Sequence, residues 1–323
     1  MKIVQFMASP KYVGAERSFV ELSNELAKED EVVALVVRGC EYKDKFSDAV
    51  KVVELRSNPS RLNPLLYIEI AKILRQERPD IVHAHSAKAA QIMERLWRVM
   101  GFSFVATKRN SKKSSVFHRI PHVVGVSKEA VKGIEGAKVI YNAITPKKLP
   151  NIQKEPIFTI VAIGALRAVK GFDELIEAAA KLPFDFRLWI VGEGEERGRL
   201  EKLIEELGVE KRVKLLGWRD DTHILQARAH LQVINSHREG FSRALIEGLF
   251  YSDVVISKPV GGSVEILPPD FIYDDPAQKI QEVYENYEDY KRRFARLKAE
   301  LAPKFHLSQT ARRYRELYKE VAG

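Results

Sequence analysis

The stretch Glu239-Gly-Phe-Ser-Arg-Ala-Leu-Ile-Glu247, which is followed by Gly261-Gly-Ser-Val-Glu265, has the pattern of a loop that enters a helix. Gly240 lets the chain turn, Ser242 is a typical helix cap, and the apolar residues after it begin a helical face. The backbone N–H groups of residues 240–243 would then lie at a helix N-terminus. Unsatisfied donors and a partial positive charge at that end suit a phosphate. The stretch therefore predicts a loop and helix that hold an anionic ligand.

The two glutamates at the ends of the first segment have two interpretations. Glu239 and Glu247 can accept hydrogen bonds from the hydroxyl groups of a sugar or a ribose. They can equally be a charged cap and one residue of a solvated helix face. Glu247, however, lies inside the apolar run Ala244–Phe250, where an unpaired carboxylate would be costly to bury. A ligand can supply the partners that such a carboxylate needs, and the implied ligand is a sugar joined to phosphate.

Length and composition limit the class of protein. With 323 residues and 45% hydrophobic content the chain is globular, and it is long enough for two domains at ~100–200 residues each. No apolar run reaches the ~18–20 residues that span a bilayer, and the apolar start Met1–Phe6 is too short for a secretory signal. The one cysteine, Cys40, excludes an internal disulfide and a cysteine-based metal cluster. We therefore expect the protein in the cytoplasm.

The net charge of +9 is placed unevenly along the chain. Residues 1–150 carry 26 Lys and Arg against 16 Asp and Glu, whereas residues 151–323 carry 27 against 28. Between Lys88 and Arg119, eight basic residues and one acidic residue, Glu94, are interleaved with apolar ones. Such a surface can rest on an anionic membrane, bind nucleic acid or an anionic acceptor, or be only a solvated basic face. No helix-turn-helix or aromatic-basic RNA motif favours nucleic acid.

Strand-like apolar runs alternate with helical patterns in both halves of the chain, which predicts α/β architecture with a doubly wound, Rossmann-like parallel sheet in each half. The turn-prone segment Thr145–Asn151 contains two prolines and separates the halves. We place the first domain at residues 1–147 and the second at 148–305. The expected strands are 2–6, 31–37, 80–85, 103–107, 122–126, 138–141, 158–163, 187–191, 213–216, 231–234 and 254–257. The expected helices are 14–26, 65–75, 86–99, 127–134, 172–181, 195–207 and 222–227, with further helix after residue 276.

Two doubly wound domains joined by a short linker place the carboxyl ends of both sheets around one cleft, where ligands of such folds bind. The loops at those strand ends are therefore the candidate sites. In the first domain these loops are 8–14, 83–85, 108–110 and 141–142. In the second domain they are 164–171, 192–194, 217–219, 236–241 and 259–265. Their candidate binding residues include Gly14, Gly164, Gly192, Trp218 and Glu265.

Basic and small residues in these loops suit a diphosphate. Arg167 and Lys170 can neutralise a diphosphate and stabilise it as a leaving group, although a solvated basic loop is the alternative. Gly14, at a helix N-terminus, can let the backbone approach a diphosphate, or it can be an ordinary turn.

The histidines of the third predicted strand are candidates for the first domain. We place His83 and His85 on opposite faces of the strand, so that only one faces the cleft, and His85 is nearer the strand end. Neither indicates a metal site, because no carboxylates accompany them at ligand spacing and the chain contains no Asp-x-Asp pair.

Four stretches in order resemble the retaining glycosyltransferases of family 4, which are two-domain enzymes of the B-type fold. They are Gly14–Arg17, Pro79–Ser86, Val126-Ser127 with Val139–Ala143, and above all Glu239–Glu265, with two glutamates separated by seven residues and then a double glycine and another glutamate. The glutamate spacing alone is weak evidence, whereas the four stretches in order are strong evidence. The resemblance covers essentially the whole chain, and it implies that a final helix, about residues 306–323, returns to the first domain.

The resemblance implies the transfer of a sugar from a nucleotide diphosphate donor with retained anomeric configuration and with neither a metal nor another cofactor. By position, Glu247 would hold the ribose, Glu239 would contact the donor sugar, and Lys170 would bind the diphosphate. Phe241 and Ser242 would offer backbone amides. The expected acceptor is a cell-surface glycan, a lipopolysaccharide or a lipid-linked sugar, reached from the inner face of the cell membrane.

The chain departs from the family pattern at several positions. Ala165 stands where an arginine usually follows the glycine of the diphosphate loop, and Arg167 is the candidate replacement. Val13 replaces one of the two glycines of the first loop. Many members have a histidine that touches the donor sugar or the acceptor where this chain has three other polar residues. The acceptor-side candidates are therefore His85, Lys108, Arg109 and Asn110.

Two other functions remain open at this point. A nucleotide-sugar epimerase shares this fold and would form its product without any acceptor. A protein that binds nucleic acid or an anionic surface through the basic first domain would show a steep dependence on salt.

Overall fold

The computed structural model describes residues 1–323 and divides the chain into two units. Unit 1 consists of Met1–Ile144 and His306–Gly323, and unit 2 consists of Thr145–Phe305. The expected first boundary, after residue 147, lies three residues beyond the end of the first segment of unit 1. Each unit is built on its own parallel sheet.

Seven parallel strands form the sheet of unit 1. They are β1 (Lys2–Met7), β2 (Glu31–Val37), β3 (Val50–Leu55), β4 (Ile81–His85), β5 (Phe104–Lys108), β6 (His122–Gly125) and β7 (Lys138–Val139). Their order across the sheet is β3-β2-β1-β4-β5-β6-β7. The central strands are almost wholly buried and most of their residues are apolar, because helices cover both faces of the sheet.

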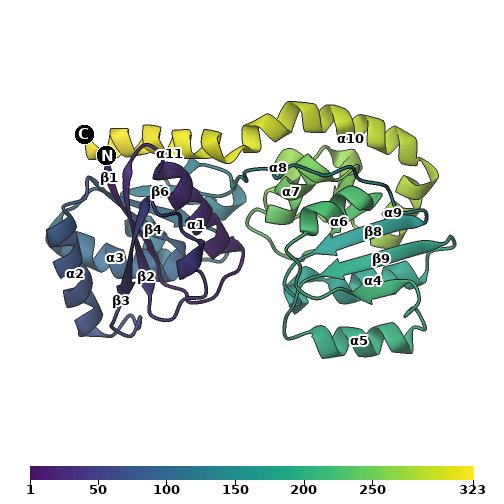
Figure 1. Ribbon diagram of the computed structural model, residues 1–323, viewed down its shortest axis with the longest axis horizontal. Helices are drawn as coiled ribbons and strands as arrows, with labels where there is room; N and C mark the ends of the chain where they lie inside the picture. Colours follow the sequence, from purple (N-terminus) through teal and green to yellow (C-terminus); the bar gives the residue numbers. More distant parts are fainter. The chain divides into compact units, whose positions relative to one another are not determined.

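The helices of unit 1 cover its sheet in two pairs. They are α1 (Gly14–Leu26), α2 (Pro64–Glu77), α3 (Ser86–Met100) and α11 (Leu307–Ala322), with the 3-10 turns η1 (Lys43–Lys45), η2 (Ser115–Arg119) and η3 (Glu129–Val131). One core joins Phe19 of α1 to Tyr318 of α11, and the other joins Leu66 of α2 to Ile92 of α3. Figure 1 shows α11, in yellow, beside α1, in purple. The last helix of the chain thus belongs to the core of unit 1.

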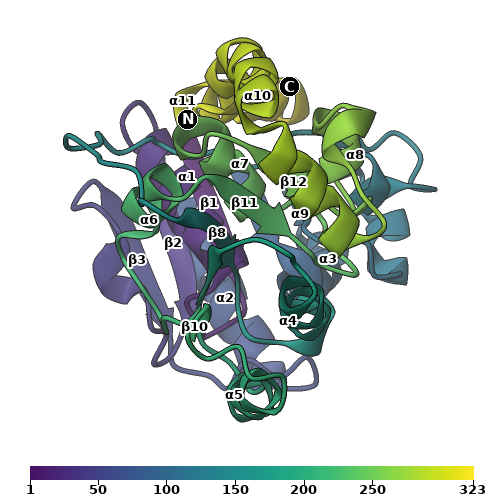
Figure 2. The same cartoon turned by 90° about the vertical axis from the view of Figure 1, so that its right-hand side faces the viewer.

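Unit 2 has a five-stranded parallel sheet with helices on both sides. Its strands are β8 (Phe158–Ile163), β9 (Phe186–Val191), β10 (Val213–Leu215), β11 (Leu231–Ile234) and β12 (Val255–Ser257), in the order β10-β9-β8-β11-β12. Its helices are α4 (Phe172–Ala180), α5 (Arg197–Glu206), α6 (Thr222–Arg228), α7 (Arg243–Tyr251), α8 (Ser263–Ile266), α9 (Pro276–Glu285) and α10 (Tyr287–Leu301), with the 3-10 turns η4 (Ala168–Lys170), η5 (Pro269–Phe271) and η6 (Ala302–Phe305). Figure 2 shows α6 and α7 on one side of this sheet and α4 and α9 on the other.

The prediction of a doubly wound sheet in each half is confirmed, and two details of the predicted elements are wrong. Strand β3 at the sheet edge was not predicted, because its apolar residues alternate with charged ones. The helix expected at 127–134 is only the turn η3. The Ser127 hydroxyl oxygen accepts from the Ala130 N–H at 3.0 Å, but the N-cap residue of η3 is Lys128. The turn ends at Lys132, whose ψ of 124° is not helical, and Gly133 follows with a φ of +78°.

Candidate functional site

The stretch 239–265 forms the predicted loop and helix after β11. Ser242 caps α7, because its hydroxyl oxygen accepts a backbone N–H of the first turn at 3.3 Å. The double glycine packs directly onto the loop before the helix: the Gly262 N–H donates to the Gly240 carbonyl at 3.0 Å. A methyl group added to Gly262 would lie 1.8 Å from the Phe241 Cδ2 atom. The glycines therefore give this loop its shape by letting two backbone segments touch.

An ion pair joins the loops that follow β8 and β11, which are neighbouring strands. Lys170 Nζ lies 2.5 Å from Glu239 Oε2, and the two side chains are 22% and 20% exposed. The Asn235 side-chain amide joins the same loops, because it donates to the Gly171 carbonyl at 2.5 Å. The structure thus brings together two of the three predicted catalytic residues. A charge-assisted contact of this kind holds both side chains at the carboxyl edge of the sheet until a charged ligand competes for one of them.

The other basic candidate, Arg167, lies outside this ion pair. It is the N-cap residue of η4, and its side chain is exposed. Gly164 and Gly192 follow β8 and β9, and the Gly192 N–H donates to the Gly217 carbonyl at 2.8 Å. Trp218, the next residue, is 63% exposed. These predicted binding residues thus lie at the carboxyl edge of the same sheet.

The buried carboxylate of Glu247 has a partner within its own helix. Glu247 is 7% exposed, and its Oε1 atom lies 3.7 Å from Arg243 NH2, one turn earlier in α7. The expectation that a buried glutamate needs partners holds, but Arg243 supplies one without a ligand. Burial of Glu247 is therefore weaker evidence for a ligand than the sequence suggested. Glu265 lies half-buried in the short helix α8.

The expectation that His83 and His85 point to opposite faces of a strand is wrong. Side chains in a strand alternate, so residues two positions apart share a face. Both histidines belong to β4 and are fully buried, and their ring centroids lie 4.0 Å apart. Two imidazole rings are therefore available to one hydrogen-bond network.

Arg109 and His85 are brought together at the carboxyl ends of β4 and β5. Arg109 NH2 lies 2.9 Å from His85 Nδ1, and its NH1 donates to Asn142 Oδ1 at 3.1 Å. Lys108 is instead turned inward, where its ammonium donates to the Asn110 carbonyl at 2.5 Å. Lys108 therefore closes its own loop, and Asn110 is exposed at the tip. Gly14, the first residue of α1, is exposed on the loop that follows β1.

The sequence analysis missed two buried polar residues of unit 1 that contact these histidines. His85 Nε2 lies 2.5 Å from Gln5 Oε1, and Gln5 Nε2 donates to the Tyr318 hydroxyl at 3.1 Å. The same hydroxyl lies 2.7 Å from His83 Nδ1. A polar residue within the apolar strand β1 is the signal that could have revealed Gln5. Tyr318 gives no comparable signal, because its ring joins the apolar core of unit 1.

Burial controls the protonation of both histidines. Burial holds the pKa of His83 far below its ordinary value, and the positive charge of Arg109 lowers it further. Burial likewise lowers the pKa of His85, with smaller contributions from His83 and Arg109. Each ring is therefore neutral at pH 7, so it donates one hydrogen bond and accepts one.

Part of the basic stretch Lys88–Arg119 is used inside unit 1. Glu94, which is 3% exposed, is contacted by Arg98 at 2.7 Å and by Arg119 at 3.1 Å. Arg95, Lys108 and Arg109 also donate to groups of unit 1, so five of the eight basic residues bind groups of their own unit. The stretch is thus less basic toward solvent than its composition predicts.

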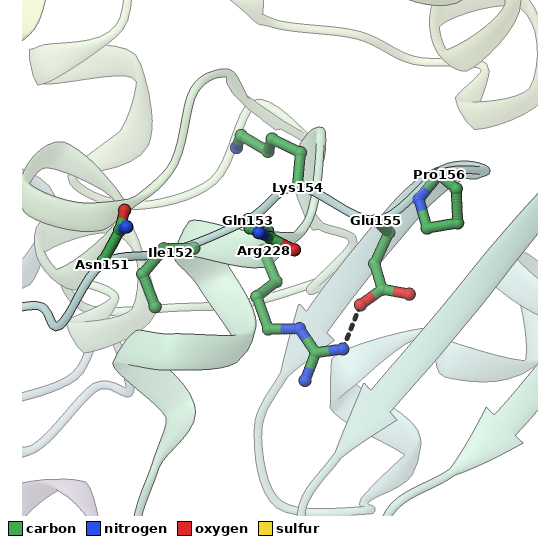
Figure 3. Close-up of a pocket in the computed structure, with 7 residues that line it drawn as sticks. All are labelled: Asn151, Ile152, Gln153, Lys154, Glu155, Pro156 and Arg228. Carbon is green, nitrogen blue, oxygen red and sulfur yellow. Dashed lines mark hydrogen bonds and ion pairs between the residues drawn. The ribbon is translucent and has the colours of Figure 1, made fainter.

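A cavity of about 440 Å³ lies beside the linker of unit 2, before β8 begins. Figure 3 shows its lining, with a dashed line between Arg228 and Glu155. Glu155 also contacts Arg187 at 3.0 Å, and Lys154 contacts Asp253 at 2.9 Å. The cavity lies at the amino end of β8, away from the loops at the carboxyl ends, and its charged side chains already pair with one another.

No three His, Cys, Asp or Glu side chains are grouped so that they could hold a metal ion. No helix combines the length and the apolar character needed to cross a bilayer.

Two parallel-sheet units, with the candidate residues on loops at the strand ends, define the architecture of a B-type glycosyltransferase. A crystal structure of Anabaena Alr3699/HepE in complex with UDP superposes with a TM-score of 0.83 over 99% of this chain and 100% of that chain, at 20% identity. The apo form of the lipopolysaccharide outer core galactosyltransferase WaaB gives a TM-score of 0.75 over 99% and 100% of the two chains, at 17% identity. At these identities the likeness shows the shared fold.

Sequence comparison defines the family. The model of Glycosyltransferase Family 4 matches residues 12–147, and the model of Glycosyl transferases group 1 matches residues 144–300. The lipopolysaccharide core biosynthesis glycosyltransferase LpsE of Rhizobium meliloti is 30% identical over 274 residues, which cover 80% of this chain and 78% of LpsE. The chain therefore belongs to the family 4 glycosyltransferases, as the resemblance predicted.

The two buried histidines predict how the stability of unit 1 depends on pH. Their pKa values are lower in the folded state than the ~6.5 of an unfolded chain. Below pH ~6.5 the unfolded chain therefore binds more protons, so stability is complete above that pH and falls as the pH drops. We expect the free energy of unfolding to fall from pH 7.5 to 5.5 by up to about 1.4 kcal/mol per pH unit for each histidine.

Urea unfolding followed through Trp97 measures this effect in unit 1, in a variant that carries Trp189→Phe and Trp218→Phe. His122→Gln is the matched control, because His122 is exposed at the start of β6. The His122→Gln variant should keep most of the pH dependence of the free energy of unfolding. Equal stability at pH 7.5 and 5.5 would contradict the assignment of two buried neutral histidines.

Proposed function

We propose that the chain transfers a sugar from a nucleotide diphosphate donor to a cell-surface glycan, a lipopolysaccharide or a lipid-linked acceptor, with retained anomeric configuration and without a metal. The observation that carries the proposal is the contact between Lys170 and Glu239 beside the capped start of α7, in a chain of the family 4 glycosyltransferases. The names of its Rhizobium meliloti relatives, which act in lipopolysaccharide core biosynthesis, support an acceptor of this class.

The diphosphate of the donor would exchange with Glu239 as the partner of Lys170. Lys170 Nζ now lies 2.5 Å from the negatively charged carboxylate of Glu239. A diphosphate oxygen is also negatively charged and can take the place of that carboxylate. The backbone amides of Phe241 and Ser242, near the N-terminus of α7, would add donors, and Arg167 would add charge from its exposed position. Once Lys170 has moved to the diphosphate, the carboxylate of Glu239 can accept a hydrogen bond from a hydroxyl of the donor sugar.

The ribose would bind to Glu247. A carboxylate can accept hydrogen bonds from the two hydroxyls of a ribose. Arg243 NH2, 3.7 Å from Glu247 Oε1, orients the carboxylate of Glu247. Gly164, Gly192, Trp218 and Glu265 complete the proposed donor region on the neighbouring loops.

The proposed chemistry needs no protein nucleophile. The bond between the anomeric carbon and the diphosphate oxygen breaks, and its electron pair leaves with the diphosphate. The acceptor hydroxyl forms the new bond on the same face, and its proton passes to a diphosphate oxygen. Lys170, Arg167 and the helix amides stabilise the charge that develops on the leaving group. Retention follows because departure and attack use one face of the sugar.

Acceptor binding would fall to unit 1. Arg109 and Asn110 follow the carboxyl end of β5, where a parallel sheet binds its ligands, and the fully buried His85 would act through Arg109. Lys108 is turned inward and would act by shaping the loop. The rival epimerase would convert a nucleotide sugar in the absence of acceptor, and the relatives that match this chain favour transfer instead.

Substitutions at the ion pair test the donor site through nucleotide binding. UDP serves as the first probe because it is bound in a structural relative, and GDP and ADP complete the panel. We expect Lys170→Ala to weaken binding of the preferred diphosphate about tenfold to a hundredfold, because a charge-assisted hydrogen bond contributes roughly 1.5–3 kcal/mol. We expect Glu239→Gln to tighten binding of the diphosphate several-fold, because the variant has no ion pair with Lys170 that must break before the diphosphate binds. Titration calorimetry measures both.

The exposed Lys202 of α5 supplies the matched control, and Lys202→Ala should bind like the wild type. The uncharged nucleoside is a second control, since loss of Lys170 should not change its affinity. Wild-type diphosphate affinity in correctly folded Lys170→Ala protein would refute the assignment.

We also propose that unit 1 rests on the anionic inner face of the cell membrane. Three apolar side chains around the start of α2 are strongly exposed: Leu62 (84%), Leu65 (64%) and Ile68 (52%). Basic side chains lie next to them, since Arg95 donates to the Arg61 carbonyl at 2.7 Å. Exposed apolar side chains beside cations favour an anionic bilayer surface. The geometry does not favour nucleic acid, because five basic residues of the stretch 88–119 bind groups within the unit.

Co-sedimentation with vesicles tests the membrane proposal. The protein should pellet with phosphatidylglycerol-containing vesicles at low salt and less with pure phosphatidylcholine vesicles, because each cation near an anionic surface adds on the order of 1 kcal/mol. With the double substitution Leu62→Ser and Leu65→Ser, most of the protein should stay in the supernatant instead of pelleting with the vesicles. Leu207→Ser, at an exposed apolar position of unit 2, is the control and should bind normally. Absence of binding to anionic vesicles at low salt would remove the proposal.

A further inference from the structure

A chain of hydrogen bonds runs through the buried interior of unit 1 from Arg109 to the last helix. Its direction at the first step follows from chemistry. A guanidinium group only donates, so His85 Nδ1, 2.9 Å from Arg109 NH2, must be the nitrogen without a proton. The neutral ring of His85 therefore carries its proton on Nε2. That proton is donated to Gln5 Oε1, 2.5 Å away.

The direction then passes from the amide to the tyrosine of α11. Because Gln5 Oε1 accepts from His85, the Gln5 Nε2 group is the donor to the Tyr318 hydroxyl at 3.1 Å. Tyr318 therefore has its own proton to give to His83 Nδ1 at 2.7 Å. Gln5 and Tyr318 are 313 positions apart in the sequence, so this contact links the two ends of the chain.

The last two hydrogen bonds follow in the same way. With Nδ1 accepting, the neutral ring of His83 donates from Nε2 to the Thr107 hydroxyl oxygen at 2.7 Å. The Thr107 hydroxyl is then the donor to the Tyr314 hydroxyl at 3.1 Å. Every donor thus points the same way, from Arg109 toward Tyr314. A reversal before Tyr318 would set two donors or two acceptors against each other, and a reversal after it would leave the buried hydroxyl proton of Tyr318 without an acceptor.

We propose that Tyr318 is a positioning residue for Arg109. Its hydroxyl is the one group of α11 that both accepts from Gln5 and donates to His83, so it fixes the orientation of the Gln5 amide and, through it, the tautomer of His85. Only the Nε2-protonated tautomer can accept from Arg109. The last helix of the chain thereby sets the direction in which Arg109 is presented at the carboxyl edge of the first sheet, where it meets the acceptor. That last clause rests on the proposed function.

The chain supplies a matched pair of substitutions. Tyr318→Phe removes a hydroxyl from the middle of the series, so the Gln5 amide loses its acceptor and can turn over. The Gln5 amide nitrogen would then face His85, which would move its proton to Nδ1 and stop accepting from Arg109. Tyr314→Phe removes only the final acceptor, so every bond before Thr107 keeps its direction. Both tyrosines are buried in the same core, so the two substitutions alter packing alike.

Proton–nitrogen correlation spectra of protein labelled with ¹⁵N-histidine measure the tautomers directly, at pH 7.5 and without any substrate. In the wild type we expect two rings with a protonated Nε2 and a bare Nδ1 whose Nε2 protons exchange slowly with water. Tyr318→Phe should shift the ring nitrogens of His85, whereas Tyr314→Phe should leave them at their wild-type positions. His85 is identified by the signals that change in Arg109→Lys, since a lysine cannot reach His85 and Asn142 together.

Transfer kinetics give the second readout. Tyr318→Phe should raise the KM for acceptor several-fold and leave the KM for donor unchanged, and Tyr314→Phe should match the wild type in both. Unchanged His85 signals in folded Tyr318→Phe protein, or equal changes in both variants, would overturn the inference. Failure of the proposed function is distinguishable, because it would show as absent nucleotide binding by the wild type while the histidine spectra still decide the role of Tyr318.

Discussion

All strands of each sheet run in the same direction, and this constraint shapes the whole molecule. Parallel strands need a crossover connection, so helices cover both faces and the strands must be apolar on both sides. The carboxyl ends of all the strands then meet at one edge. Residues far apart in the sequence, such as Lys170 and Glu239, come into contact there because β8 and β11 are neighbours in the sheet although β9 and β10 lie between them in the chain.

Polar groups at and below these edges are held in different ways in the two units. In unit 2 the loops carry a charged pair that remains about one-fifth exposed, and a ligand with charge can exchange with it. In unit 1 the buried histidines, Gln5 and two tyrosines satisfy one another as neutral groups. Neutral groups that pair with one another avoid the cost of burying a charge on each of them, and each pairing fixes a direction. Unit 2 is therefore suited to exchanging the partner of a charged side chain for a charged ligand. Unit 1 is suited to holding polar side chains in fixed orientations.

Much of the fold could be predicted from the sequence, because long apolar runs and helical periodicity report on local structure. The cap at Ser242 and the strands around it were predicted from local pattern alone. The edge strand β3 was missed, since an alternating pattern marks a strand with one side less buried and the prediction looked for continuous runs. The shared face of His83 and His85 follows from strand geometry and was misjudged.

The candidate site was predicted less completely, because its partners come from distant parts of the chain. The exception is Glu247, whose contact with Arg243 lies within one helix and could have been predicted from their spacing of four residues. The sequence indicated Lys108 and Arg109 alike as acceptor-side candidates, whereas Lys108 is turned inward and Arg109 lies beside His85. The roles of Gln5 and Tyr318 depend on contacts between the two ends of the chain, which no local pattern encodes.

The central claim is that the carboxyl edge of the second sheet holds the diphosphate of a nucleotide-linked sugar. A crystal structure of the protein with its preferred nucleotide diphosphate sugar tests it most directly. The account predicts Lys170 Nζ within about 3 Å of a diphosphate oxygen, separated from Glu239, with Glu247 at hydrogen-bond distance from a ribose hydroxyl. A bound nucleotide elsewhere, with the Lys170–Glu239 ion pair still intact, would contradict it.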